Sequence, residues 1–452
     1  MAEPIAAHEN PEQQKYEQMW QLDDYRRYAP GEQLAMEFLK HADPPENSRI
    51  IDFGCGTGRG ALKIASQGHR VVMLDFATNC LDARVAVAVE SGSLCFYQHD
   101  LLNPSPSEAA DYGYCTDVME HIQPEYVDTV LENVLNGAKR VFFQISLQHD
   151  GCGALINETL HLTVKTMEWW TKMLRKHGAF IYYSDKRGQD AIFYVAKFES
   201  KSIEQNVETS QLLKNVTANA GLGLQQAVPH DRTDRRLLLL AGGPSLNNYE
   251  EKIKSKADSG SPIICTNGTY NWCLDRKIAP NGLIIVDARA HNVKFISEVI
   301  PTCKYMLASQ CHPDVFAAVP AEQTYIWHSQ SSDAVNDALD AVYGDEPWYA
   351  VPGGLTVTLR AISLLRMLGW WKLDIYGFDG CLVDDDHHAY EQTENEGLPV
   401  LTVTAGKREF KCHPWMEAQA KDFQKQNKVL KGDVHMNIYG DGLISHIANE
   451  EL

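Results

Sequence analysis

The sequence predicts an α/β chain made of two doubly wound domains. Its 452 residues exceed what one ordinary hydrophobic core holds. In both halves, short apolar runs rich in β-branched residues alternate with helix-compatible segments, and each half opens with a strand that leads into a glycine-rich turn. Such alternation is typical of a mostly parallel sheet with helices on both faces. We therefore expect one domain over residues 1–200, a polar linker over 201–235 and a second domain over 236–452.

The first domain is expected to contain a seven-stranded sheet. The expected strands cover residues 49–53, 71–76, 94–98, 112–116, 140–145, 180–184 and 191–198. The turn-like stretch 185–189 joins the last two, so we expect them to pair as a C-terminal antiparallel hairpin. In a doubly wound sheet a ligand binds beyond the carboxyl ends of the strands, where the strand order reverses, and this edge is where we expect the site.

A glycine turn and two acids mark that edge in the sequence. Gly54, Gly56 and Gly58 directly follow the first strand, where missing side chains let the backbone approach a ligand and the next helix offers its N–H groups. Asp75 ends the second strand, and a carboxylate there can accept both hydroxyls of a ribose. Asp100 follows the third strand, where it is placed to meet the amino group of an adenine.

The whole set of strand-end residues is more specific than the glycine turn alone, because a GxGxG turn also opens nicotinamide-binding folds. Asp52, the glycine turn, Asp75, Asp100 and the stretch Asp117 to His121 lie at the ends of successive strands. This pattern resembles the class I S-adenosylmethionine-dependent methyltransferases, particularly the small-molecule group that includes the ubiquinone-biosynthesis enzymes, over about residues 15 to 200. The resemblance implies a Rossmann-like domain with S-adenosylmethionine as cofactor. It also implies that Asp52 orients the methionyl part, that the glycine turn holds the cofactor and that Asp75 binds its ribose. Asp117 is a further candidate for binding the cofactor.

Methyl transfer is an in-line displacement, so the enzyme has mainly to align the nucleophile and exclude water. Glu120, His121 and His161 are the candidates for orienting or deprotonating the acceptor, although His121 can equally serve only to cap local structure. Asp117-Val-Met-Glu120 replaces the Asn/Asp-Pro-Pro-aromatic motif of DNA amino-methyltransferases, which disfavours a nucleobase acceptor. The N-terminal aromatic residues are interpreted either as a lid over the pocket or as packing of a helix onto the sheet; these are Tyr16, Trp20, Tyr25 and Tyr28.

The second half repeats the pattern of strand, glycine turn and helix. Strands are expected over 237–240, 262–266, 283–286, 305–308, 324–327 and 373–376, with a helix over about 357–368. Gly353 and Gly354 open that helix, and a helix start with free N–H groups favours phosphate. Neither glycine turn is the lysine-bearing P-loop.

The order of short motifs over about residues 235 to 440 resembles a domain found in two kinds of transferase. One is the archaeal-type (MptE-like) 6-hydroxymethylpterin diphosphokinases, and the other comprises motility-associated (Maf), sialyltransferase-like sugar transferases. Both relatives handle a nucleotide phosphate, so the resemblance implies a nucleotide or nucleotide-sugar site. The residues that would form it are Gly242, Gly243, Ser245, Asn267, Gly268 and Gly354. Whether sugar or diphosphate is transferred stays open.

The run Asp384-Asp-Asp-His-His388 suggests a metal, since carboxylates and imidazoles suit Mg²⁺, Mn²⁺ or Zn²⁺. Consecutive residues cannot all face one ion, so no metal ligand is assigned and a Mg²⁺ requirement is left open. The alternative is that His388, with Tyr390, serves acid-base chemistry opposite Asp287 or Asp379.

The amino-acid composition limits the classes of partner that we expect this chain to bind. A formal net charge of −19 disfavours a broad nucleic-acid surface, because phosphate binding needs clustered Lys and Arg. No segment approaches the ~20 apolar residues that span a membrane, and the start lacks a signal peptide, so a cytoplasmic protein is expected. The 11 cysteines include no CxxC pair and are expected to be reduced core thiols. A small-molecule or glycan substrate is favoured, and the oligomeric state is not determined.

Three functional hypotheses follow. The first is a bifunctional transferase, in which the first domain methylates a small molecule or glycan and the second performs nucleotide-dependent glycosyl or diphosphoryl transfer. The second keeps methyl transfer alone, with the C-terminal domain a binding module that selects the acceptor. The third is a non-enzymatic assembly or surface-decoration protein that retains two old folds.

Overall fold

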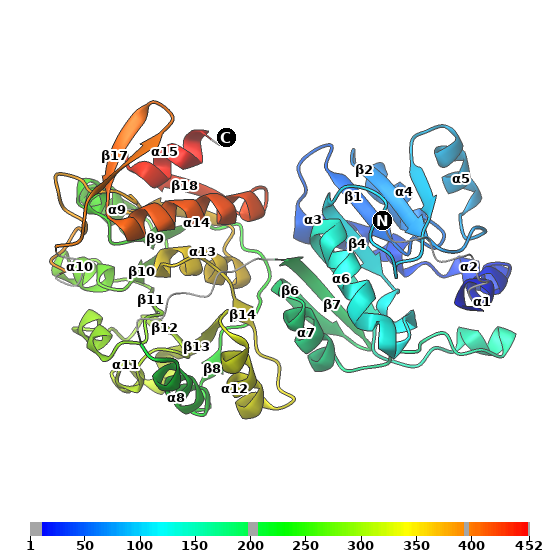
Figure 1. Cartoon of the computed structure of the whole chain (residues 1–452), viewed down its shortest axis with the longest axis horizontal. Coiled ribbons are helices and arrows are strands. Elements are labelled where there is room, and N and C mark those ends of the chain that lie inside the picture. The colour runs from blue at the N-terminus through cyan, green and yellow to red at the C-terminus, as the bar shows by residue number, and fades with distance from the viewer. Residues whose placement is uncertain (1–10, 198–206, 393–396, 451–452) are drawn as a thin grey trace. The chain divides into compact units, whose positions relative to one another are not determined.

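The computed structural model describes residues 11–197, 207–392 and 397–450. The chain divides into two compact units, Met1–Lys197 and Phe198–Leu452, each with its own sheet and helices (Figure 1). Within the described ranges, no helix combines the length and the apolar character that crossing a membrane requires. The units are described separately below.

The first unit is built on a seven-stranded sheet in the order β3-β2-β1-β4-β5-β7-β6, which confirms the predicted fold. Its first five strands are parallel, while β7 runs antiparallel to both β5 and β6. The hairpin strands are longer than expected, so that only residues 188–189 form the turn. The strands are β1 Arg49–Phe53, β2 Arg70–Asp75, β3 Cys95–Gln98, β4 Ala110–Thr116, β5 Ala138–Ser146, β6 Ala179–Arg187 and β7 Asp190–Lys197.

Helices pack on this sheet and also precede it in the chain. Helix α4 packs on β2, α3 on β4, α6 on β5 and α7 on β6. The helices are α1 Pro11–Met19, α2 Asp23–Arg27, α3 Pro30–Ala42, α4 Arg59–Ala65, α5 Ala83–Glu90, α6 Val127–Gly137 and α7 Met167–Lys176, with short 3₁₀ turns η1 Met119–His121, η2 Pro124–Tyr126 and η3 Cys152–Ile156. Strand β1 lies between β2 and β4, so the strand order reverses there and a crevice opens at its carboxyl end.

The core around β1 is close-packed. The Phe53 ring lies against Gly113 of β4 and Gly137 of α6, where a Cβ atom would come within 2.9 and 2.8 Å of ring carbons. Ile50 and Ile51 are fully buried beside it. Because packing at this density leaves no room for an added methyl group, these two glycines are fixed by the bulk of Phe53.

The second unit contains a nine-stranded, all-parallel sheet in the order β14-β13-β12-β11-β10-β9-β15-β18, with β8 also pairing with β13. A separate antiparallel hairpin joins β16 and β17. The strands are β8 Gln225–Gln226, β9 Leu237–Leu240, β10 Ile263–Thr266, β11 Gly282–Ile285, β12 Lys304–Ala308, β13 Thr324–Ser329, β14 Ala350–Val351, β15 Lys372–Tyr376, β16 Leu401–Ala405, β17 Arg408–Cys412 and β18 His435–Tyr439. Every strand predicted for this half is present, whereas β8, β14, β16, β17 and β18 were not expected from the sequence.

The helices of the second unit surround a central buried one. All residues of α13 except the first are buried, between the sheet and α14. The helices are α8 Thr209–Ala220, α9 Glu250–Asp258, α10 Thr269–Asp275, α11 Pro313–Ala317, α12 Asp333–Tyr343, α13 Val357–Met367, α14 Pro414–Leu430 and α15 Leu443–Glu450, with 3₁₀ turns η4 Pro244–Tyr249, η5 Ala290–Phe295 and η6 Ala321–Gln323.

Part of the stretch 201–235, which was expected to be a linker, is a helix in the structure. Residues 209–220 form α8, which buries Leu212 and Val216 against α12. Its Asn219 donates to the backbone carbonyls of Ser309 and Cys311, at 2.9 and 2.7 Å. An apolar stripe at helical spacing and buried amide side chains make this segment part of the second unit. Helix α8 begins at Thr209, inside the segment that was expected to be a linker.

Candidate active site

The glycine turn after β1 requires glycine on both conformational and steric grounds. Gly54, Gly56 and Gly58 have φ values of +70°, +50° and +70°, which side chains other than glycine rarely adopt. A Cβ on Gly54 would lie 2.6 Å from Val118 Cγ2. The backbone N–H groups of Gly54 and Cys55 donate to the carbonyl of Leu74, which ties the turn to β2.

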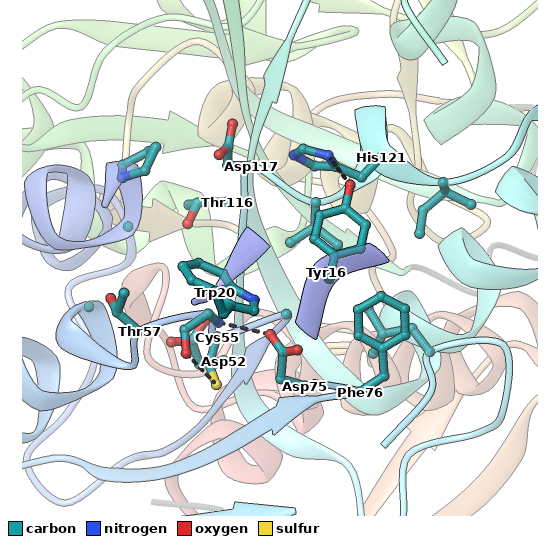
Figure 2. A pocket seen from close by; sticks show the side chains of 18 of the residues that line it. Tyr16, Trp20, Asp52, Cys55, Thr57, Asp75, Phe76, Thr116, Asp117 and His121 are labelled. Carbon is teal, nitrogen blue, oxygen red and sulfur yellow. Dashed lines mark hydrogen bonds between the residues drawn. The ribbon is translucent and has the colours of Figure 1, made fainter. Parts of the chain in front are cut away.

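Asp75 at the end of β2 holds the same turn from the side. Its Oδ2 accepts the N–H of Gly56 at 2.9 Å (Figure 2). Its Oδ1 accepts the N–H of Ala77 at 2.9 Å. Burial raises the pKa of this carboxyl to about 6, against the hydrogen bonds, which lower it. The carboxylate is therefore fixed at the mouth of the crevice and largely ionised at neutral pH.

Asp52, on β1, lies deeper in the same crevice. Burial, followed by the nearby negative charge of Asp75, raises the pKa of Asp52 to about 8. A carboxyl with this pKa is mostly protonated at neutral pH unless a cation approaches it. The site therefore contains a buried acid that a cationic ligand would ionise.

These residues share a cavity of about 210 Å³ at the reversal of strand order. It brings together seven of the residues predicted from the sequence, namely Asp52, Gly54, Gly56, Asp75, Asp100, Asp117 and His121. Three predicted residues do not line it. Gly58 lies behind the turn, against Val85 and Met73; the side chain of Glu120 turns to the backbone of Ser146; and His161 Nδ1 bonds to the carbonyl of Gln148.

Aromatic side chains from the N-terminal segment cover the cavity. Tyr16, Trp20, Tyr25 and Tyr28 all line it, and the Trp20 ring lies about 3.0 Å from where a Cβ on Gly56 would be. Arg26 attaches this segment to the loop after β2, since its guanidinium donates to the backbone carbonyl of Asn79 at 2.9 Å. The aromatic residues therefore form a wall of the cavity, in addition to packing the helices onto the sheet.

His121 lies next to the aromatic wall and is held in its neutral form. Its Nδ1 lies 2.6 Å from Tyr16 Oη (Figure 2). The same atom lies 3.2 Å from the carbonyl oxygen of Leu160. Burial lowers the pKa of His121 to about 3. A neutral imidazole with so low a pKa is a weak base, so this side chain is suited to hold a group by hydrogen bonding.

Two carboxyl groups lie beside His121. Glu120 is fully buried, its Oε1 accepts the N–H of Ser146 at 2.5 Å, and burial with the neighbouring Asp117 charge raises its pKa well above the ordinary value. Burial also raises the pKa of Asp117, which lines the cavity. The His161 ring packs edge-on against His121, with centroids 4.7 Å apart.

Comparisons with known proteins match both units. Residues 50–140 match the family model described as "Methyltransferase domain", and residues 210–385 match the model described as "6-hydroxymethylpterin diphosphokinase MptE-like". The chain carries a methyltransferase domain followed by an MptE-like domain. The second match begins within α8, in the segment that the sequence analysis assigned to the linker.

The similar proteins are mostly methyltransferases. A ubiquinone biosynthesis O-methyltransferase of Rickettsia conorii is 29% identical over 109 residues, which are 24% of this chain and 36% of that protein. The 23S rRNA (uracil(1939)-C(5))-methyltransferase RlmD of Pseudomonas fluorescens is 29% identical over 117 residues, 25% of this chain and 26% of that protein. The chain thus spans about a third or less of these curated relatives. Among solved structures, the 1,6-didemethyltoxoflavin-N1-methyltransferase of Burkholderia thailandensis is 16% identical with a TM-score of 0.34, covering 44% of this chain and 94% of its own.

In the MptE-like domain, several predicted residues meet where β9 lies between β10 and β15. Asp379 Oδ2 accepts the N–H of Ser245 at 2.9 Å and lies 2.4 Å from where a Cβ on Gly243 would be. The Tyr390 hydroxyl would lie 2.6 Å from a Cβ on Gly242, and its ring 2.5 Å from one on Gly268. His388 also contacts the Gly242 position, at 3.0 Å, and Asn267, which precedes Gly268, has a φ of +50°. The loop that carries His388 and Tyr390 therefore lies directly over the glycine turns.

Two predicted residues of this domain lie apart from that group. Although burial favours its neutral form, hydrogen bonds from Arg289 lower the pKa of Asp287, and the two side chains form an ion pair. Gly354 contacts Asp422, whose Oδ2 accepts the N–H of Leu355 at 3.1 Å. The expected phosphate position at the start of α13 thus faces a carboxylate of the same chain, which would repel an anion.

The acidic run 384–388 does not form a compact ligand set. Asp384 and Asp385 are exposed, and Asp385 pairs with Lys411 at 3.5 Å. Over the described ranges, the two groups of potential metal-ligating side chains both lie in the methyltransferase domain, and neither includes this run. Asp422 carried no signal in the sequence, because it comes from α14, more than sixty residues after Gly354.

Proposed function

We propose that the first unit binds S-adenosylmethionine in the 210 Å³ cavity and transfers its methyl group to a small molecule. The observation that carries this proposal is the convergence of Asp52, Gly56 and Asp75 on one cavity at the reversal of the strand order. S-adenosylmethionine would supply the methyl group: an acceptor nucleophile would attack the methyl carbon in line with the carbon–sulfur bond, and S-adenosylhomocysteine would leave. The family match over residues 50–140 supports the same activity.

The proposed roles follow from charge and position. Asp52, buried and raised in pKa, would ionise against the ammonium group of the methionyl part. Asp75, fixed by two backbone N–H groups, would accept hydrogen bonds from the ribose hydroxyls, and Asp100 would lie nearer the adenine. The aromatic wall of Tyr16 and Trp20 would exclude water from the reacting centre.

His121 would hold the acceptor by a hydrogen bond, because its pKa of about 3 makes it a weak base at neutral pH. Glu120 does not line the cavity and would act only through Asp117 or His121, as a positioning residue. Substitution of Glu120 would then lower the rate by displacing its neighbours.

Calorimetry with S-adenosylhomocysteine on the full chain tests the cofactor site. We expect Asp75→Ala to weaken binding by at least tenfold, through the lost ribose contacts. Asp82→Ala is a matched control, since Asp82 caps α5 outside the cavity and its loss should leave the affinity unchanged. Unchanged affinity of Asp75→Ala would contradict the proposal.

A second activity, nucleotide-dependent glycosyl or diphosphoryl transfer in the MptE-like domain, is a further candidate. The meeting of Gly242, Gly243, Ser245 and Asp379 at the strand-order reversal favours it. Calorimetry with ATP, CTP and a CTP-sugar, each with and without Mg²⁺, should detect a site that is independent of S-adenosylhomocysteine. If no nucleotide binds, the alternative of a binding module that selects the methyl acceptor is favoured.

A further inference from the structure

One of the two groups of potential metal ligands in the methyltransferase domain lies beside the glycine turn and contains two thiols. Cys55 Sγ, Cys80 Sγ and a carboxylate oxygen of Asp75 all lie within 4.8 Å of one another. Cys55 belongs to the turn after β1, Asp75 ends β2, and Cys80 lies in the loop before α5. The sequence analysis assigned no metal here, because Cys55 and Cys80 are 25 residues apart and form no CxxC pair.

The spacing of these three atoms suits a single ion. Two sulfur atoms bound to one Zn²⁺ at about 2.3 Å can lie at most about 4.6 Å apart, and a carboxylate oxygen binds at a slightly shorter distance. The three ligand atoms therefore need to move little to close around an ion. Cys55 and Asp75 also line the cavity, so an ion can reach the group from that side (Figure 2).

The surroundings of the two sulfur atoms are apolar. Cys80 is fully buried in a cluster with Met19 and Ala77, and its thiol donates to the carbonyl of Ala77 at 3.2 Å. Burial, followed by the hydrogen bond with the Cys80 thiol, raises the pKa of the Cys55 thiol well above its ordinary value. The Cys55 thiol is therefore protonated in the free protein, and a metal ion binds there by displacing the proton to solvent. The low dielectric of the cluster strengthens the attraction between a thiolate and a cation.

Asp75 connects this group with the cofactor site. Its two oxygens accept the N–H groups of Gly56 and Ala77, which fixes the carboxylate at the edge of the cavity. An ion bound to this carboxylate neutralises its charge and occupies lone pairs that ribose hydroxyls need. The ion and the cofactor therefore compete for one side chain.

We propose that Cys55, Asp75 and Cys80 bind one thiophilic divalent cation such as Zn²⁺, and that this ion inhibits cofactor binding. Thiolates are soft ligands, which select such an ion over Mg²⁺ and Ca²⁺. The bound ion links the glycine turn to the loop after β2 and withdraws Asp75 from the cofactor. Binding of the ion does not depend on the proposed methyltransferase function, whereas the inhibition rests on it.

Titration of the reduced, tag-free full chain with Cd²⁺ under anaerobic conditions tests the site, with excess Mg²⁺ present to fill carboxylate sites. Cd²⁺ bound to thiolates gives an ultraviolet charge-transfer band that oxygen and nitrogen ligands do not give. We expect this band to saturate at one Cd²⁺ per chain. Cys80→Ser should weaken binding by at least about tenfold, because a ligand is lost, and Cys55→Ser provides a second variant with the same expected effect.

Other cysteines of the chain serve as controls. Cys152 packs against the same apolar cluster as Cys80 but lies outside the group, so Cys152→Ser should leave the band unchanged. The Cys265 and Cys273 sulfur atoms in the second unit lie 3.6 Å apart, yet both are fully buried, and among the described residues no third ligand completes a group with them. Cys265→Ser should therefore leave the stoichiometry at one Cd²⁺ per chain.

Calorimetry with S-adenosylhomocysteine, with and without Cd²⁺, tests the competition. Saturating Cd²⁺ should lower the affinity by about tenfold or more, and S-adenosylhomocysteine should lower the Cd²⁺ affinity by the same factor, because coupling between two ligands is reciprocal. Cys80 is not among the residues that line the cavity. Metal-free Cys80→Ser should therefore keep the affinity of the unmodified chain, which also shows that it is folded, and should lose the effect of Cd²⁺.

The outcomes separate the metal site from the proposed function. No saturable thiolate band in the unmodified chain, or an equal band in both folded variants, would overturn the metal site. An S-adenosylhomocysteine affinity that Cd²⁺ leaves unchanged would overturn the competition. If the metal-free chain binds no S-adenosylhomocysteine while the Cd²⁺ band is present, the proposed function fails and the metal site stands.

Discussion

Asp52 couples ligand binding to pH at the scale of the single residue. Its pKa rises from an ordinary 3.8 to about 8, mainly because the carboxyl is buried. The free protein therefore binds a proton at neutral pH that a cationic ligand must displace. Asp75 has a pKa of about 6, so its carboxyl group binds a proton only in mildly acidic solution.

The first prediction concerns the affinity for S-adenosylmethionine between pH 6 and 8. Since Asp52 must lose its proton to accept an ammonium group, the affinity should rise with pH by up to about tenfold per unit and level off above about pH 8. Calorimetry in buffers of different ionisation enthalpy should detect the released proton. Asp52→Asn should bind more weakly and lose this dependence; a pH-independent affinity in the unmodified protein would contradict the assignment.

The second prediction concerns stability without ligand. Because the folded-state pKa of Asp52 is raised, its contribution is fully present below about pH 4 and is lost as pH rises through about 8. Asp52→Asn should therefore stabilise the ligand-free methyltransferase domain at pH 8, by on the order of 1–3 kcal/mol. Thermal unfolding at pH 5 and pH 8 measures the difference, which should be smaller at pH 5. Equal effects at both values would show that charge is not the cause.

At the level of secondary-structure elements, a buried ion pair joins α13 to the segment that follows α14. Arg366 donates to both oxygens of Asp433, at 2.8 and 3.1 Å, and both side chains are almost fully buried. Such a pair is costly to break from one side, because the remaining charge is left in a low-dielectric interior. The contact therefore ties the segment after α14 to the central helix.

The third prediction follows from this pair. Asp433→Ala should lower the free energy of unfolding of the MptE-like domain by about 3–5 kcal/mol, because it removes the buried carboxylate that accepts two hydrogen bonds from the Arg366 guanidinium. Asp441→Ala is the matched control, since Asp441 pairs with Arg408 on the surface and its loss should cost less than about 1 kcal/mol. Urea unfolding followed by tryptophan fluorescence measures both. If both variants lost the same free energy of unfolding, the expected large cost of breaking the buried pair would be contradicted.

At the scale of the whole molecule, the two units have separate cores and separate sheets. A ligand that binds only the first unit should stabilise that unit alone. This expectation links the proposed cofactor site to a measurement that does not depend on the methyl acceptor.

The fourth prediction is that calorimetric unfolding shows two transitions, of which only one responds to S-adenosylhomocysteine. At a ligand concentration of about 100 times the dissociation constant, the methyltransferase domain should gain about 2.7 kcal/mol. The transition of the MptE-like domain should stay in place, and Asp433→Ala should lower that one alone. A common shift of both transitions would contradict the independence of the units.

The repeating pattern of strands made much of this fold predictable. The sequence predicted all seven strands of the first unit and six strands of the second to within a few residues. Their buried apolar runs, bounded by glycine turns, form a local pattern that can be recognised in the sequence alone. Short or exposed strands were not: β8 and β14 have two residues each, and β16 alternates too weakly. Helix α8 was assigned to a linker because its polar face dominates its composition.

The sequence by itself determined the local requirements of the first site. Glycines at positive φ and acids at strand ends are fixed by backbone geometry, so Asp52, Gly56 and Asp75 could be assigned to one edge of the sheet. Only the tertiary structure decided which distant side chains meet in the two units. In the first unit His161 approaches His121; in the second, Asp422 accepts the N–H of Leu355 before α13, and Tyr390 covers Gly242 and Gly268. The physical reason is that such contacts join segments far apart in the chain, and packing of whole elements, rather than local spacing, brings them together.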